Sequence, residues 1–205
     1  MDKGELRRRL RARRAERWVL EHAAADRARL ERLLELTDGA SSVAVYLSVE
    51  PEPDTLQFIS SLPTGVRVLV PYLSASPDWA EYSGPDSLKP GPHGIPQPDG
   101  RRLGVEALAD ADVIVLPGLA ATRGGTRLGQ GGGWYDRALV GTKGKRVLLL
   151  NHDEIVDQLP SEPWDLPVDV IVTEKETIQA RDFLDGSHSL LAAAKSSRAL
   201  RLRAA

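Results

Sequence analysis

The chain has 205 residues, a formal net charge of −2 and 41% hydrophobic residues. These values predict one domain with a sizeable core, and they exclude a global electrostatic attraction to nucleic acid or to a membrane surface. The absence of cysteine excludes disulfides and thiolate metal sites, and no stretch reaches the ~18 apolar residues of a membrane span. We therefore expect a soluble, cytoplasmic protein with no nucleic-acid or membrane partner.

Three helices and two strands are predicted in the first part of the chain. Apolar periodicity favours helices over residues 3–17 and 19–36. Short apolar runs over 42–47 and 66–70 are typical of strands. Between them we expect a helix over 54–61, with Asp54 as its cap.

The second part of the chain alternates apolar runs with glycine-rich segments. Residues 79–82 fit one strand of an inserted hairpin, and the many Pro and Gly residues of 83–104 predict mostly loop. A helix is expected near 134–140. Further strands are expected over 113–116, 146–150 and 168–172.

This alternation of continuous apolar strands and helices predicts an α/β fold. We expect a single-domain three-layer sandwich, in which helices cover both faces of a mostly parallel sheet. Ligands of such folds bind beyond the carboxyl ends of the strands. The loop 117–133 follows strand 113–116, so it lies where a site is expected. Residues 174–205 are Ala- and Arg-rich and predict a tail that is helical or partly disordered.

The segment from Arg127 to Arg137 is the most informative part of the chain, because closely spaced glycines lead into aromatic residues, an acid and an arginine. Glycines permit positive φ and close approach of the backbone, so successive N–H groups can converge on an anion. We interpret the segment as a cradle for a polyphosphate. The alternative is a flexible surface loop that closes onto an ordinary helix, with Asp136 present because acids suit a first helical turn.

The segment departs from the common phosphate-binding motifs. A P-loop needs Lys and then Ser or Thr after its last glycine, whereas Trp134 follows Gly133 here, and a dinucleotide fingerprint needs glycine at position 134. The histidines lack the spacing of zinc ligands, and no Gly-x-Ser-x-Gly elbow is present. Zinc hydrolases and serine hydrolases are therefore excluded.

Three stretches resemble the signature of 5-formyltetrahydrofolate cyclo-ligases, also called methenyltetrahydrofolate synthetases: Pro117-Gly118-Leu119-Ala120, Gly125-Thr126-Arg127-Leu128-Gly129 and Tyr135-Asp136-Arg137. The similarity runs from Lys3 to about Thr173. It implies a cyclo-ligase domain over residues 1–173, with ATP as co-substrate and Mg²⁺ as cofactor.

The ATP side of the site is implied by this resemblance. Lys3 and Arg7 are four residues apart, so on a helix they project from one face, and Arg127 offers phosphate a planar fork of donors. A loop arginine paired with a nearby acid is the alternative for Arg127. The resemblance implies that Lys3 and Arg127 are catalytic and that ATP contacts Lys3, Arg7, Arg127, Gly129, Gln130, Gly131, Gly132, Gly133, Trp134 and Tyr135.

The metal and folate sides follow in the same way. Asp136 and Asp169 are implied as Mg²⁺ ligands, although an acid beside the 168–172 strand is also expected to be merely solvated. A carboxylate can pair with the amino-pyrimidinone edge of a pterin by two parallel hydrogen bonds, which suits Glu52. The implied folate contacts are Leu47, Glu52, His93, Gly94, Ile95, Pro96 and Tyr135.

Several positions depart from the family pattern. His93 stands where a bulky aromatic is often found, Ala121-Thr122 replaces Phe-Asp, Trp134 replaces Tyr, and Gln130 replaces Tyr or Arg. These changes concern the lining of the pocket rather than the class of reaction.

The resemblance implies an enzyme that closes the ring of 5-formyltetrahydrofolate to give 5,10-methenyltetrahydrofolate, and we expect it to be a monomer. ATP would phosphorylate the formyl oxygen, and ADP and phosphate would be released. A non-catalytic nucleotide- or folate-binding paralogue is the alternative. An RNA-binding module that uses the basic residues 3–17 is disfavoured by the acidic remainder of the chain.

Overall fold

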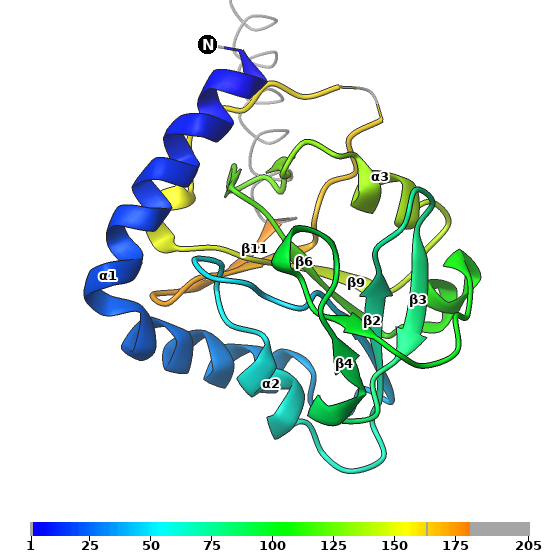
Figure 1. Ribbon diagram of the computed structural model, residues 1–205. Helices are drawn as coiled ribbons and strands as arrows, with labels where there is room; N and C mark the ends of the chain where they lie inside the picture. The colour runs from blue at the N-terminus through cyan, green and yellow to red at the C-terminus, as the bar shows by residue number, and fades with distance from the viewer. Residues whose placement is uncertain (1, 163, 181–205) are drawn as a thin grey trace, which may run out of the picture.

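A seven-stranded sheet forms the centre of the computed structural model, which describes residues 2–162 and 164–180 (Figure 1). The strand order is β11-β10-β9-β6-β1-β2-β3. The five inner strands are parallel, and both edge strands pair antiparallel. The predicted mostly parallel sheet is therefore confirmed. Its strands are β1 (Ser42–Val45), β2 (Arg67–Tyr72), β3 (Asp78–Glu81), β6 (Val113–Pro117), β9 (Lys145–Leu149), β10 (Val170–Val172) and β11 (Thr177–Gln179).

Shorter elements connect these strands. Two small hairpins are formed by β4 (Leu88–Lys89) with β5 (Gln97–Pro98), and by β7 (Ala120–Ala121) with β8 (Arg127–Leu128). The α-helices are α1 (Lys3–Leu36), α2 (Leu56–Ser61) and α3 (Trp134–Ala138). The 3₁₀ turns are η1 (Pro85–Ser87), η2 (Pro92–Gly94), η3 (Val105–Asp110) and η4 (His152–Glu154).

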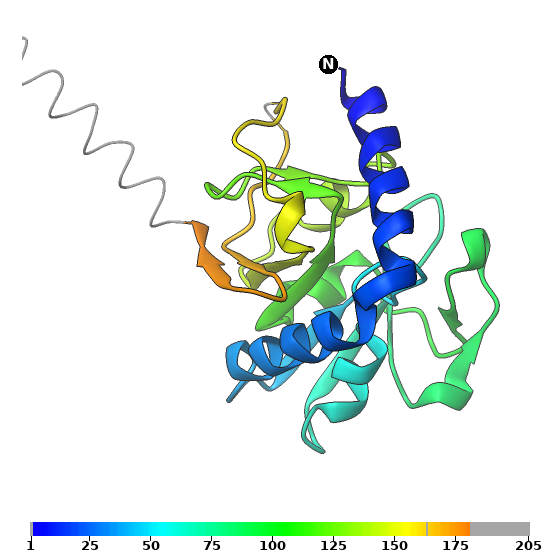
Figure 2. The same cartoon turned by 90° about the vertical axis from the view of Figure 1, so that its left-hand side faces the viewer.

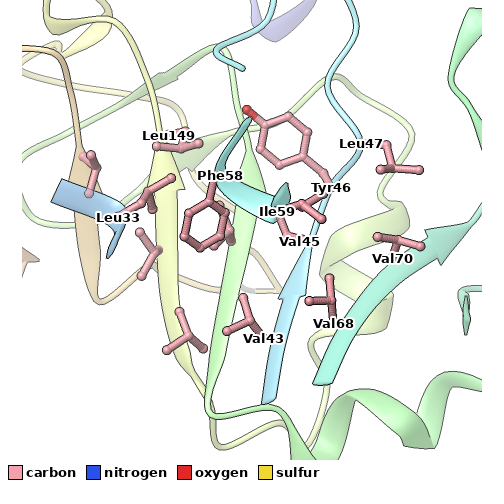
Figure 3. Close-up of a cluster of buried hydrophobic side chains, with 14 of the residues drawn as sticks. Leu33, Val43, Val45, Tyr46, Leu47, Phe58, Ile59, Val68, Val70 and Leu149 are labelled. Carbon is pink, nitrogen blue, oxygen red and sulfur yellow. The ribbon is translucent and has the colours of Figure 1, made fainter. Parts of the chain in front are cut away.

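Side chains of the inner strands alternate between two cores, because successive residues of a strand point to opposite faces. On one face, valines of β1, β6, β9 and β10 pack with Leu33 of α1 and with Phe58 and Ile59 of α2 (Figure 3). On the other face, Ile114, Leu148 and their neighbours pack under η3 and α3. Helical elements thus cover both faces, which confirms the predicted three-layer arrangement.

Helix α1 is one continuous element rather than the two helices predicted over 3–17 and 19–36. Its axis bends part-way along, so its two halves run in different directions (Figures 1 and 2). The first half packs through Leu10 onto Leu119 and Leu128 of the β7–β8 region, whereas the second half packs through Leu33 onto the sheet. The bend lets one helix contact both the sheet and the glycine-rich region.

The sheet extends past residue 173, because β11 pairs antiparallel with β10. Part of the predicted tail over 174–205 is therefore an edge strand, and residues 181–205 lie outside the described part of the chain. Alternating burial of Ile178 between exposed neighbours is typical of such an edge strand. Along residues 2–162 and 164–180, no helix combines the length and the apolar character needed to cross a bilayer.

Candidate active site

A cavity of about 680 Å³ opens at the carboxyl ends of β1, β2 and β6. Its floor includes Tyr46 and Leu47 after β1, Pro71 in β2 and Pro117 at the end of β6. The chain runs from β1 to β2 on one side and later returns to β6 on the other side of β1. This reversal of strand order is the place where open α/β sheets bind ligands.

The glycine-rich loop forms one wall of the cavity, and the residues from Gly129 to Gly133 all line it. Gly131 has φ 110° and Gly133 has φ 61°, a region that side chains other than glycine rarely adopt. A Cβ atom at Gly131 would also lie 3.4 Å from the guanidinium of Arg7. The backbone therefore needs glycine at these two positions.

Helix α1 brings its first basic residues to this loop. Arg7 Nε donates to the carbonyl oxygen of Gly129 at 2.9 Å, and Lys3 Nζ lies 2.9 Å from Asp165 Oδ2. Both cations line the cavity, as expected for residues four apart on one helical face. Asp2 fixes the start of the helix by accepting from the backbone N–H groups of Gly4 and Glu5.

Arg127 lies on β8 with only 5% of its side chain exposed. Its Nη2 donates to Asp136 Oδ1 of α3 at 2.5 Å, so the predicted alternative of a pairing with a nearby acid is observed. Its Nε–H is buried and has no partner among the described residues.

Glu52 lines the same cavity, next to the glycine loop, and is half-buried. Its Oε2 accepts from the Val49 backbone N–H at 3.3 Å, and its Oε1 accepts from Gln130 Nε2 at 3.1 Å. Burial raises the pKa of the Glu52 carboxyl, although these hydrogen bonds and the charge of Arg14 act in the opposite direction. Gln130 also accepts from Arg11, through Oε1 at 3.1 Å and through its backbone oxygen at 2.8 Å. Gln130 thus links α1 and the glycine loop to Glu52.

Aromatic rings line the base of the cavity. Tyr135 and Trp134 lie edge to face with their centroids 4.9 Å apart, and Trp79 stands 5.6 Å from Trp134. Burial raises the pKa of Tyr135 well above its ordinary value, so its hydroxyl stays protonated at neutral pH. An aromatic wall of this kind suits a flat ring system.

Only some of the remaining predicted folate-binding residues line the cavity. Leu47 and Ile95 line the cavity, but Gly94 and Pro96 are not among its lining residues. The side chain of His93 lies outside the described part of the chain. The neighbouring Pro92 lines the cavity, so this segment does approach it.

Of the two predicted Mg²⁺ ligands, Asp136 and Asp169, only Asp136 lies at the cavity. Asp136 lines the cavity, whereas Asp169 precedes β10 at the amino end of the sheet, and its Oδ2 accepts from the Arg146 backbone N–H at 2.9 Å. Asp165, four residues before Asp169, does line the cavity, as Asp136 does. Burial alone would raise the pKa of Asp165, but hydrogen bonds from Lys3 and from the Glu162 backbone hold it below its usual value.

Sequence reasoning missed Asp165, the exposed Trp164 beside it and the turn after β2 that contributes Leu73, Ser74 and Ala75 to the cavity. No local motif marks these residues. Asp165 is held at the cavity by its hydrogen bond from Lys3, which is 162 positions away in the chain.

Comparison with known proteins identifies the family. A profile described as the 5-formyltetrahydrofolate cyclo-ligase family matches residues 1–174. The chain belongs to this family. The match includes both walls of the cavity and the whole of α1, so the family assignment and the observed site cover the same part of the chain.

Individual relatives agree with the family assignment. A 5-formyltetrahydrofolate cyclo-ligase of Mycolicibacterium smegmatis is 32% identical over 149 residues, which cover 68% of this chain and 76% of the relative. One of Escherichia coli is 34% identical over 142 residues, or 65% of this chain and 78% of that protein. An NMR structure of an Aquifex aeolicus 5,10-methenyltetrahydrofolate synthetase has a TM-score of 0.78 and 30% identity, and covers 88% of this chain and 94% of that one.

Proposed function

We propose that this cyclo-ligase family member converts 5-formyltetrahydrofolate to 5,10-methenyltetrahydrofolate with consumption of ATP. The observation that carries the proposal is the cavity at the carboxyl ends of β1, β2 and β6. Its lining combines glycine amides and cations suited to phosphate with Glu52 and Tyr135, which suit a pteridine. Two substrates in one cavity can react directly with each other.

The proposed reaction begins at the formyl group, which is an amide with a weakly electrophilic carbon and a poor leaving group. The formyl oxygen attacks the γ-phosphorus of ATP, and the bond to ADP breaks. The resulting iminium phosphate is attacked at carbon by N10 of the same folate, which loses its proton. Phosphate then leaves with the electrons of the C–O bond, and the methenyl bridge is complete.

Phosphoryl transfer needs positioning and charge stabilisation rather than a protein nucleophile. In the proposed complex, Lys3, Arg7 and Arg127 neutralise the phosphates, and the amides from Gly129 to Gly133 fix their position. Trp134 and Gln130 complete the nucleotide wall. Glu52 orients the pteridine so that the formyl oxygen faces the γ-phosphate. Arg127 lines the cavity directly before the glycine loop, and this position supports its role as a phosphate donor.

The chemistry of the cavity fits Mg²⁺, which prefers one or two carboxylates together with waters and substrate phosphates. Asp136 and Asp165 line the same cavity, so we propose these two as the metal-binding carboxylates, and we assign Asp169 to the hydrogen bond that joins β10 to β9. No cluster of three or more metal-binding side chains occurs in the described ranges, 2–162 and 164–180. The bound ion would supply charge neutralisation to the phosphates.

A direct assay tests this function. The protein is mixed with 5-formyltetrahydrofolate, ATP and Mg²⁺, and formation of the methenyl product is followed by its absorbance. We expect product to form only when all three are present. Binding of folate and ATP without product would instead support the non-catalytic paralogue that the sequence left open.

Glu52 gives the folate affinity a defined pH dependence. Pterin N–H groups bond more strongly to an ionised carboxylate than to a protonated one, and the pKa of Glu52 is raised above 4.5, so folate affinity is expected to fall as the pH drops through that raised value. Glu52→Gln should weaken folate binding by about 10- to 100-fold and should abolish this fall of affinity at low pH. Fluorescence titration between pH 5 and 8, in steps of about half a unit, measures both effects. If folate affinity still falls at low pH in the variant as it does in the wild type, Glu52 does not recognise the pterin.

A further inference from the structure

The two catalytic cations are each paired with an acid of the same cavity. Lys3 Nζ lies 2.9 Å from Asp165 Oδ2, and Arg127 Nη2 lies 2.5 Å from Asp136 Oδ1. All four residues line the cavity. The donors that a triphosphate would use are therefore already engaged with carboxylates.

The charges around the cavity nearly cancel. Three acids face four cations, which leaves one net positive charge; the acids are Glu52, Asp136 and Asp165, and the cations are Lys3, Arg7, Arg127 and Arg137. A free triphosphate carries several negative charges, so it would be repelled by the acids and would have to displace them from Lys3 and Arg127. A divalent cation that arrives with the nucleotide gives the carboxylates a new partner and makes the two cations available to phosphate.

We propose that Asp136 and Asp165 determine nucleotide specificity, because their ion pairs with Arg127 and Lys3 make the cavity select a metal-bound triphosphate over a free one. This inference rests on the proposed function, since it takes a triphosphate as the ligand. Both partners of each pair line the cavity, so the exchange of partners needs no change of fold. The two acids thus act as competitors of the free nucleotide in addition to holding the metal.

The inference predicts an unusual gain of binding. Asp165→Asn keeps the shape of the side chain and an oxygen that can accept from the Glu162 backbone N–H, but it removes the charge that holds Lys3. Isothermal titration with ATP in EDTA should show about tenfold tighter binding by the variant than by the wild type. Titration with Mg²⁺ and ATP together should show weaker binding by the variant.

A double-mutant cycle separates the ion pair from a general effect of charge. With Lys3→Met as background, Asp165→Asn should tighten metal-free ATP binding by less than about twofold, because no cation remains to be released. Glu162→Gln, which removes an exposed acid three residues away, should leave metal-free ATP binding within about twofold of the wild type. An equal gain in the Lys3→Met background, or the same gain from Glu162→Gln, would overturn the proposal.

The same titrations distinguish this inference from the proposed function. If Mg·ATP binds to the wild type but Asp165→Asn does not tighten metal-free ATP binding, the inference fails and the proposed function stands. If neither form of ATP binds to any variant, both fail.

Discussion

Arg127→Ala is expected to lower kcat/KM for the cyclisation by about 1000-fold while the fold stays intact. Arg127 lines the cavity directly before the glycine loop, and a fork of donors aimed at transferring phosphate contributes a large share of such a rate. Within residues 2–162 and 164–180 its side chain donates to Asp136, which is itself part of the cavity lining, so little of the surrounding fold depends on this bond. Methenyl absorbance gives the rate, and thermal denaturation followed by circular dichroism checks the fold.

Two further variants make this result specific. Arg127→Lys keeps the charge but loses the planar fork, so it should restore only part of the rate. Arg123 lies in the turn between β7 and β8, pairs with Glu176 at 2.6 Å and does not line the cavity. Arg123→Ala should therefore keep nearly full turnover. Near-normal turnover of Arg127→Ala would remove this residue from the proposed mechanism.

Glu154→Leu is expected to lower the free energy of unfolding by about 3–5 kcal/mol, because it leaves the Arg14 guanidinium buried without its partner. The two side chains are 3% and 1% exposed and approach to 2.6 Å. Arg14 also donates to the Gly118 carbonyl oxygen at 2.7 Å, and Glu154 accepts from the Asn151 backbone N–H at 2.9 Å. This pair therefore fixes the first half of α1 to the ends of β6 and β9. Urea unfolding measures the loss.

Comparison with an exposed pair controls this measurement. Arg67 and Glu81 lie 3.3 Å apart on neighbouring strands with much of both side chains exposed, so Glu81→Gln should cost less than about 1 kcal/mol. The double variant Arg14→Met/Glu154→Leu should recover part of the lost stability, since no unpaired charge stays buried. A Glu154→Leu unfolding midpoint equal to that of the wild type would show that the pair does not hold α1 in place.

The strands could be predicted from the sequence because burial on both faces leaves continuous apolar runs. Val113–Pro117 and Lys145–Leu149 lie within one residue of the predicted strands, and the Asp54 carboxylate accepts from the first backbone N–H groups of α2 as expected. The glycine loop was also predictable, because backbone positions with positive φ, such as Gly131 and Gly133, favour glycine and so appear in the sequence as a cluster of glycines.

Other features depend on long-range contacts that leave no local pattern. Asp165 rather than Asp169 reaches the cavity because Lys3 and the path of the chain before β10 place it there. The link from Gln130 to Glu52 joins positions 78 residues apart. The continuity of α1 through its bend could not be predicted either, because the two apolar stripes face different partners.

A crystal structure with Mg²⁺, a non-hydrolysable ATP analogue and 5-formyltetrahydrofolate tests the proposed site most directly. We expect the triphosphate on the amides of residues 129–133, between Arg127 and the first turn of α1, and the pteridine against Glu52 with its formyl oxygen facing the γ-phosphate. A nucleotide bound outside the cavity, or a folate distant from its phosphates, would contradict the proposed function.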